Sequence, residues 1–348
     1  MGRFDCIILY NAATVRAAPG SEEKVYPANL IREEVSAIED SLRELGFAPY
    51  VLLIEGFSKD LMLTLHRMAP KFVFNLCEEI EGNCELEMCV AGLLELMGIP
   101  YTGSGPLALG LGLNKFHVKQ ILRAAGIPTP HGFLCSAGHQ LKPQATRRFP
   151  VIVKPVHEDA SLGINAKSVC SDFGQLERQV SYIHDVYGQD ALVERFLEGR
   201  EFNVSILGGR DLQVLAISEI DFSLMPENEP RVVSYRAKWD EESVVYQGTV
   251  PVCPAEISPR QENRIKSVAL RSCKCIGCRD YARIDMRTDA DGNIYVLEVN
   301  PNPDLSPSAG FARAAQAAGL TYTEMVARIA QAALERGAKV PATAYAFS

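Results

Sequence analysis

Two carboxylates, an amide and a guanidinium are clustered in the sequence near its C-terminal end. An Asp-Gly pair at 291–292 is a strong hairpin signal, and it separates two runs that alternate like strands. Side chains two residues apart in a strand share a face, so Arg283 lies beside Asp285 and Glu298 beside Asn300. A two-residue loop places Asp285 directly across from Glu298, whereas a four-residue loop moves the pair to a diagonal on the same side.

These groups suit a divalent cation and phosphate chemistry. Magnesium takes one or two carboxylates and completes its octahedron with water and substrate phosphates. A nearby arginine matches the negative charge that develops during phosphoryl or acyl transfer. The alternative is an edge hairpin with a solvated polar face. The polar ending of an otherwise apolar strand, Glu-Val-Asn-Pro-Asn-Pro at 298–303, favours a functional site instead.

The composition limits the partners of the chain. Its 348 residues predict two or three lobes. A net charge of −8 argues against broad binding to nucleic acid or anionic membranes, so a nucleotide needs a local cluster of cations. No apolar run reaches the roughly 20 residues of a membrane span, and residues 1–10 lack a signal-peptide pattern. Ten cysteines in a chain of this size are typical of reduced thiols in the cytoplasm. The three at 273–278 lack the fourth ligand of a structural zinc site.

Strands and helices alternate in the first hundred residues, which predicts a doubly wound, mostly parallel α/β sheet. The expected strands are 4–10, 48–54 and 72–76, and the expected helices are 29–45 and 85–97. A Gly- and Pro-rich hinge follows at 98–106. Beyond it we expect helices at 114–125 and 263–274, strands at 149–155, 191–194 and 201–208, and a helix-rich tail at 311–337. Residues 221–254 have few regular signals, which predicts a lid, a binding loop or disorder.

No phosphate-binding loop of the Gly-x-x-x-x-Gly-Lys-Ser/Thr type is present, yet several motifs in a fixed order carry lysines and acids. They are Gly-Ile-Pro-Tyr-Thr-Gly-Ser-Gly-Pro at 98–106, Asn-Lys-Phe-His-Val-Lys at 114–119, Gly-Ile-Pro-Thr-Pro at 126–130, Phe-Pro-Val-Ile-Val-Lys-Pro at 149–155, Val-Glu-Arg-Phe-Leu-Glu-Gly-Arg-Glu-Phe at 193–202, Tyr-Arg-Ala-Lys-Trp at 235–239, and the hairpin. In this order the chain resembles the ATP-grasp superfamily, in its D-alanine–D-alanine ligase-like branch, over about residues 72–335. The resemblance implies a Rossmann-like pre-ATP-grasp domain (1–106) followed by a two-lobed α+β ATP-grasp domain (107–192 and 193–348), with a mobile loop at 221–254.

The resemblance also implies how ATP is bound. Lys115 and Lys154 match the lysines that hold the α- and β-phosphates from facing lobes. Glu194 and Leu197 match the linker that reads the adenine, and Glu201 matches the acceptor of the ribose hydroxyls. For Lys154 the sequence adds its own argument, since a lysine within an apolar strand is rarely buried without a partner.

For catalysis, the resemblance assigns the remaining positions. Lys238 matches the mobile-loop lysine that reaches the γ-phosphate. Asp285, Glu298 and Asn300 match the ligands of two Mg²⁺ or Mn²⁺ ions, with Glu298 bridging them. Arg283 matches the arginine that stabilises an acyl phosphate and a tetrahedral intermediate. The implied reaction joins a small carboxylate to an amine at the expense of ATP, and family members are often homodimers.

The departures from the family pattern concern the substrates. The glutamate-bearing, glycine-rich loop of D-alanine–D-alanine ligases has no counterpart at 10–20, and their His-Gly and Gly-Glu-Asp-Gly segment is replaced at 75–83. Ala160 and Ala309 occupy positions where the family has serine, Trp239 occupies that of a tyrosine, and Asp304 that of a glycine. Unpaired polar groups in a pocket are costly, so these changes predict substrates other than two D-alanines. A diverged D-alanine–D-alanine ligase and an ATP-grasp kinase or nucleotide-binding protein stay open as alternatives.

Overall fold

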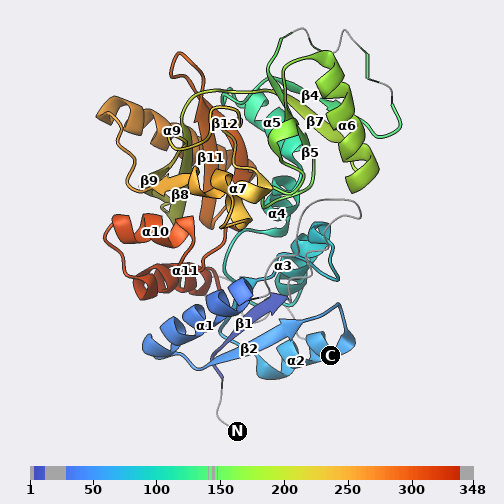
Figure 1. Cartoon of the computed structure of the whole chain (residues 1–348). Coiled ribbons are helices and arrows are strands. Elements are labelled where there is room, and N and C mark those ends of the chain that lie inside the picture. The colour runs from blue at the N-terminus through green and yellow to red at the C-terminus, as the bar shows by residue number, and fades with distance from the viewer. Residues whose placement is uncertain (1–3, 12–28, 140, 143–145, 147, 338–348) are drawn as a thin grey trace.

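The computed structural model describes residues 4–11, 29–139, 141–142, 146 and 148–337. In these residues the strands form three sheets, of three, four and five strands, which follow one another along the chain (Figure 1). The glycine-rich loop expected to differ at 10–20 lies mostly outside the described residues.

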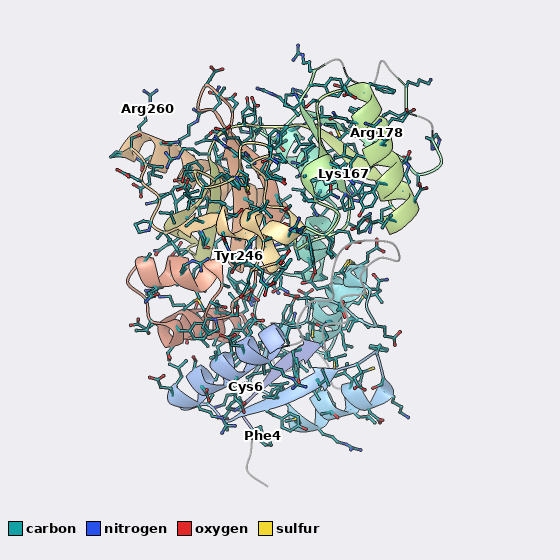
Figure 2. The ribbon with its side chains drawn as sticks, in the orientation of Figure 1. Phe4, Cys6, Lys167, Arg178, Tyr246 and Arg260 are labelled. Atoms are coloured by element: carbon teal, nitrogen blue, oxygen red, sulfur yellow. The ribbon has the colours of Figure 1, made fainter. Side chains whose placement is uncertain are left out.

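The first sheet is parallel, as the sequence predicts. It has the order β2-β1-β3 and consists of β1 (Cys6–Asn11), β2 (Pro49–Ile54) and β3 (Phe72–Leu76). The helices of this domain are α1 (Asn29–Glu44), α2 (Lys59–Met68), the short 3₁₀ helix η1 (Cys84–Leu86) and α3 (Glu87–Leu96). Cys6 and Ile8 of β1 pack in one core with α1, whereas Ile7 and Leu9 pack in another with α2 and α3. Phe4, just before the strand, is exposed at the edge of the domain (Figure 2). Helices on both faces therefore define a doubly wound domain.

The second sheet is antiparallel and belongs to the central lobe. Its order is β4-β7-β5-β6, from β4 (Gly132–Cys135), β5 (Val151–Pro155), β6 (Val169–Cys170) and β7 (Ala191–Arg195). The connecting helices are α4 (Pro106–Gly112), α5 (Lys115–Ala124), η2 (Ala166–Ser168) and α6 (Phe173–Tyr187). Val151 and Val153 of β5 pack against α6, so Lys154 points away from that core. β7 spans the expected division at 192/193, and the chain leaves this sheet only after Arg195.

The third sheet places polar residues on one face and a hydrophobic core on the other. It has the order β10-β9-β8-β11-β12 and consists of β8 (Glu201–Gly208), β9 (Gln213–Asp221), β10 (Val250–Val252), β11 (Asp280–Thr288) and β12 (Ile294–Asn300), all antiparallel. Phe202, Val204, Ile284 and Met286 pack against α9 (Pro259–Ile276). This helix begins before the predicted residue 263 because the Ser258 side chain accepts a hydrogen bond from Gln261 N and caps it.

The last helices connect the two ends of the chain. Helices α10 (Gly310–Ala317) and α11 (Tyr322–Gly337) confirm the predicted helical tail. Phe311, Met325 and Ile329 share one core with Val35 and Ile38 of α1. The C-terminal helices thus pack against the N-terminal domain, and the segment after β12 is held between them (Figure 1).

The segment 221–254, expected to be irregular, contains two short helices, α7 (Tyr235–Trp239) and α8 (Val244–Gln247), besides β10. Ser234 and Ser243 cap them by accepting hydrogen bonds from Ala237 N and Tyr246 N. A small core of Phe222, Met225, Ala237 and Val245 holds the segment together. Helices of one turn are too short to show a periodicity in the sequence, which explains the difference.

Candidate active site

The predicted site residues surround a single cleft of about 1900 Å³, bordered by the polar face of the third sheet, the central lobe and segment 221–254. The predicted residues that line it are Lys154, Glu194, Leu197, Glu201, Lys238, Arg283, Asp285, Glu298 and Asn300. Lys115 is buried beside them, with its Nζ 3.6 Å from Glu298 Oε1. The structure therefore brings together residues that are up to 185 positions apart in the sequence, from Lys115 to Asn300.

The hairpin pairs Asp285 with Glu298, and Arg283 with Asn300. The loop is longer than the two or four residues considered from the sequence, because Thr288 pairs with Ile294 and leaves 289–293 unpaired. An irregularity between residues 285 and 286 of β11 adds one residue to β12 and shifts the register back. The predicted pairing is confirmed, but it depends on a bulge that the sequence analysis did not foresee.

Asp285 is already engaged on both of its carboxylate oxygens. Arg283 donates to it from Nε and Nη2, at 2.8 and 2.9 Å, in a bidentate pair. Asn203 Nδ2, from the facing position on β8, donates to Oδ1 at 2.8 Å. These contacts fix the orientation of the carboxylate across the centre of the sheet.

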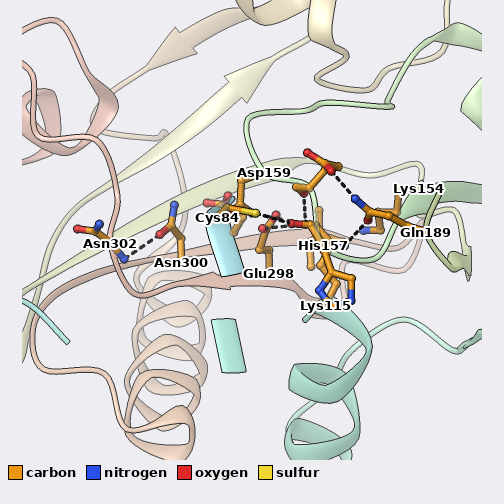
Figure 3. A network of polar contacts seen from close by, with 12 residues as sticks. Cys84, Lys115, Lys154, His157, Asp159, Gln189, Glu298, Asn300 and Asn302 are labelled. Atoms are coloured by element: carbon orange, nitrogen blue, oxygen red, sulfur yellow. Dashed lines mark hydrogen bonds and ion pairs between the residues drawn. The ribbon is translucent and has the colours of Figure 1, made fainter. Parts of the chain in front are cut away.

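Lys115 joins the hairpin to the loop that follows β5 (Figure 3). Its Nζ lies 3.5 Å from Asp159 Oδ1 and also donates to the Glu158 carbonyl. Burial alone lowers the pKa of Lys115, but the carboxylates of Glu298 and Asp159 outweigh it and raise that pKa. Burial and the adjacent Glu298 raise the pKa of Asp159. The cluster thus holds a charged lysine against two facing acids.

Glu194 is bracketed by two lysines in the interior of the central lobe. Lys119 Nζ lies 2.7 Å from its Oε1, and Lys154 Nζ lies 2.7 Å from its Oε2. Glu194 and Lys119 are each only 1% exposed. Burial, with some help from Lys154, lowers the pKa of Lys119 to about 8. In the structure the Glu194 carboxylate pairs with both lysines, an arrangement that the sequence analysis did not anticipate.

At the other end of the cleft, Glu201 pairs with Arg287, whose Nη1 lies 2.9 Å from Glu201 Oε2. The Arg287 guanidinium lies over the rings of Phe196 and Phe222, 4.9 and 5.4 Å from their centroids. Leu197, close by, is buried and lines the same end. The pair therefore borders a hydrophobic end of the cleft.

The segment 221–254 contacts the loop after β5 at two points. Tyr235 N donates to Ile164 O at 2.9 Å, and Trp239 Nε1 donates to Ala160 O at 3.1 Å. Ala160 has a φ of +54°, an uncommon conformation for a residue with a Cβ. Lys238 Nζ lies over the Trp239 ring, 4.8 Å from its centroid. These contacts hold Lys238 against the cleft.

The sequence analysis did not assign four site residues, namely Asn203, Arg287, Lys119 and Asp159. Asn203 lies two residues after Glu201, and Arg287 lies two residues after Asp285, so strand alternation places each on the same face as its predicted neighbour. Lys119 follows Lys115 by one helical turn. For Asp159 no local pattern existed, because only the fold brings its loop to Lys115.

The donor set fits a magnesium ion that ATP helps to coordinate. Within the described ranges, no group of three or more His, Cys, Asp or Glu side chains forms a self-contained metal site. Asp285, Glu298 and Asn300 offer two carboxylates and an amide along one edge of the cleft. Magnesium rarely requires more than this when substrate phosphates supply its other ligands.

Facing lobes with lysines on one side and paired acids on the other have the arrangement expected of the ATP-grasp class. A family model described as the C-terminus of D-ala D-ala ligase matches residues 121–331. The chain belongs to the D-alanine–D-alanine ligase family, and the expectation from the sequence motifs is confirmed.

Individual relatives cover most of the chain. An uncharacterized protein, y4sG, of Sinorhizobium fredii is 34% identical over 319 residues, or 89% of each chain. The D-alanine–D-alanine ligase of Alcanivorax borkumensis is 32% identical over 303 residues, or 87% of this chain and 88% of that one. The crystal structure of D-alanine–D-alanine ligase from Bacillus anthracis complexed with ATP has a TM-score of 0.72 at 21% identity, over 96% of this chain and 99% of that one. That likeness confirms the predicted fold class.

No helix within the described part of the chain is long and apolar enough to cross a membrane.

Proposed function

We propose that this protein joins the carboxylate of one small, amino-acid-like substrate to the amine of another, with conversion of ATP to ADP and phosphate. The observation that supports this most is the meeting of Lys115 and Glu298 at 3.6 Å, because it brings a phosphate-binding cation from one lobe to a metal-binding acid of the other. Glu298 and Asp285 are paired across the hairpin, so a triphosphate entering here meets both acids.

In the proposed complex, Lys115 and Lys154 bind the α- and β-phosphates, and Lys238 approaches the γ-phosphate. Leu197 and the linker at Glu194 border the adenine. Glu201, held by Arg287 through one oxygen, accepts from the ribose hydroxyls through the other.

Asp285, Glu298 and Asn300 would hold Mg²⁺. When bound, the ion neutralises charge on the transferring phosphoryl group and aligns the reactants.

The reaction then proceeds in two displacements. A carboxylate oxygen of the acid substrate attacks the γ-phosphorus, and the bond from phosphorus to the ADP oxygen breaks, giving an acyl phosphate. The amine nitrogen next attacks the acyl carbon, the bond to phosphate breaks, and the amine proton leaves to solvent or phosphate. Arg283 and Lys238 stabilise the negative charge on the acyl phosphate and on the tetrahedral intermediate.

The names of the curated relatives favour a second candidate, the joining of two D-alanines. Ala160, Trp239 and Asp304 argue against it, because they stand where the family has a serine, a tyrosine and a glycine. A homodimer, a cytoplasmic location and the mobility of residues 221–254 stay predictions from the sequence.

The test is a screen of pairs of L- and D-amino acids for release of ADP and phosphate. A ligase releases both only when acid and amine are present together, whereas a kinase releases ADP and a phosphorylated product with a single substrate. With a productive pair, Glu298→Gln should lower kcat at least about a hundredfold, since it removes a charge that acts on the transition state. Glu177→Gln, on the exposed side of α6, is the control. Unchanged turnover in Glu298→Gln would overturn the metal assignment, and dipeptide from D-alanine alone would establish the second candidate.

A further inference from the structure

Acidic residues from three parts of the chain gather at the end of the cleft next to the N-terminal domain. Glu78, Glu87 and Asp304 line this end, and Glu34 of α1 lies behind Asp304, where its Oε1 accepts a hydrogen bond from Leu305 N at 2.9 Å. These four side chains are called the acidic cluster below. They lie outside the predicted nucleotide and metal sites.

The pKa values of three of these acids, Glu34, Glu78 and Glu87, are raised. Burial, followed by Asp304 and Asp159, raises the pKa of Glu78 to about 7. Burial first, and then neighbouring acids that include Glu78, raise the pKa values of Glu34 and Glu87 well above their usual range. Burial and the proximity of other acids therefore disfavour ionisation of Glu34, Glu78 and Glu87, and a cation bound among these carboxyl groups would favour it.

No described residue forms an ion pair with any of the four. The hydrogen-bond partners of these side chains in the described part of the chain are neutral. Asn302 Nδ2 donates to Glu87 at 2.8 Å, and Ser306 N donates to Asp304 at 2.8 Å. Among nearby cations, Lys238 interacts electrostatically with Glu78 and Asp304 without an ion pair, Arg283 is paired with Asp285, and Arg313 donates to the Ser308 carbonyl.

A second, independent feature of the same end is the hydroxyl of Ser306. The residue is 1% exposed and lines the cleft, and its Oγ has no hydrogen-bond partner among the described residues. A buried hydroxyl without a partner is costly in a folded protein, so such groups usually serve a ligand or water. Ser306 lies two residues beyond Asp304 and is joined to it by the hydrogen bond from Ser306 N.

We propose that the acidic cluster and the Ser306 hydroxyl bind a cationic side-chain group of the substrate, an ammonium or guanidinium additional to its α-amino and α-carboxyl groups. The substrate class is then a basic amino acid. This inference rests on the proposed function and specifies one substrate of the same site. An organic cation fits better than a metal ion, because no three acid, histidine or cysteine side chains in the described ranges converge tightly enough for one. D-Alanine has no such group.

The test compares amino acids that differ only in this charge. Binding of L- and D-lysine is measured calorimetrically against norleucine, and of L- and D-arginine against citrulline, with AMP-PNP and Mg²⁺ present. We expect at least one charged amino acid to bind at least tenfold more tightly than its neutral counterpart. Asp304→Asn, which keeps an acceptor for Ser306 N, should abolish that preference and leave the neutral amino acid unaffected. Glu78→Gln is a second variant with the same expected effect.

The control is Glu177→Gln, which changes the net charge by the same amount on an exposed face of α6 and should leave every affinity unchanged. Thermal unfolding with and without AMP-PNP establishes that each variant is folded. Equal affinities within both pairs, or a preference that survives both Asp304→Asn and Glu78→Gln, would overturn the inference.

Failure of the proposed function looks different from failure of this inference. If only neutral amino acids are ligated, the acidic cluster has no role in substrate choice but the ligase remains. If basic amino acids bind with the expected preference and no pair releases phosphate, the proposed reaction is wrong and the binding site stands.

Discussion

Asp285 lies directly opposite Glu298 although the loop between their strands has five residues, 289–293. A ladder continued regularly from the pair of Met286 and Val296 would instead place Leu297 opposite Asp285. The bulge at Leu297 restores the pairing, and the Leu297 carbonyl accepts a hydrogen bond from Lys119 Nζ at 2.8 Å. The position of the two acids proposed to bind metal thus depends on a lysine of another lobe.

Replacement of Lys119 by methionine should therefore destabilise the protein. The change leaves Glu194 with one lysine and removes the donor to Leu297 O, and breaking a buried ion pair typically costs about 3–5 kcal/mol. Since Lys154 still neutralises Glu194, we expect a loss of about 2–3 kcal/mol, measured by urea unfolding. Lys167→Met, at an exposed lysine, is the control. A variant as stable as the native protein would contradict the proposed dependence.

Removal of the hydrogen bond from Trp239 to Ala160 should loosen segment 221–254. Trp239→Phe keeps an aromatic ring beside Lys238 but loses the Nε1 donor, whose bond is worth about 1 kcal/mol. With AMP-PNP bound, we expect faster proteolysis within 221–254 and a kcat about fivefold to tenfold lower. Trp239→Ala, which removes both contacts, should be worse on both measures. Identical proteolysis of native protein and Trp239→Phe would show that the contact does not hold the segment.

The wild-type chain offers a direct report on the same segment. Trp239 is its only tryptophan, so the fluorescence of the native protein follows this side chain alone. Because Lys238 lies over the ring, we expect AMP-PNP with Mg²⁺ to change the emission, and Lys238→Met to reduce that change. If the emission does not change when the nucleotide binds, Lys238 does not approach the phosphates.

The stability of the hairpin loop should depend on pH through Asp289. Although burial acts in the opposite direction, hydrogen bonds from Asn293, Tyr295 and the Asp291 amide lower the pKa of Asp289. A carboxyl group with a lowered pKa in the folded state contributes stability above its unfolded pKa, about 3.9, and this contribution is lost as the pH falls through the folded pKa.

Asp289→Asn should thus cost about 1–2 kcal/mol of unfolding free energy at pH 7, and less as the pH is lowered below about 4. Chemical unfolding across this pH range measures the difference. Asp211→Asn, at an exposed turn, should show no such trend. A constant difference between Asp289→Asn and the native protein down to pH 3 would exclude a lowered pKa.

Strands β1, β2, β3, β5, β7 and β8, the first and last helices and the hairpin could be predicted, because each has a local sequence pattern, whereas β4, β6, β9 and β10 were not predicted. The alternation of Arg283 and Asp285 with apolar residues specifies one face of β11 wherever the strand is placed. The apolar run of β1 indicates burial on both sides. Motif order then indicated the family. The short helices α7 and α8 were not predicted, because one turn contains no period.

The amino-acid sequence by itself determined the class of chemistry, since residue types and their alternation specify which groups share a face. The tertiary structure alone decided the partners of those groups: Glu194 between two lysines, Asp159 beside Lys115, and Glu34 behind Asp304. Contacts between distant segments depend on how sheets and helices pack, and no spacing along the chain encodes that distance. The electrostatic character of the cleft, and with it the choice of substrate, therefore emerges only from the fold.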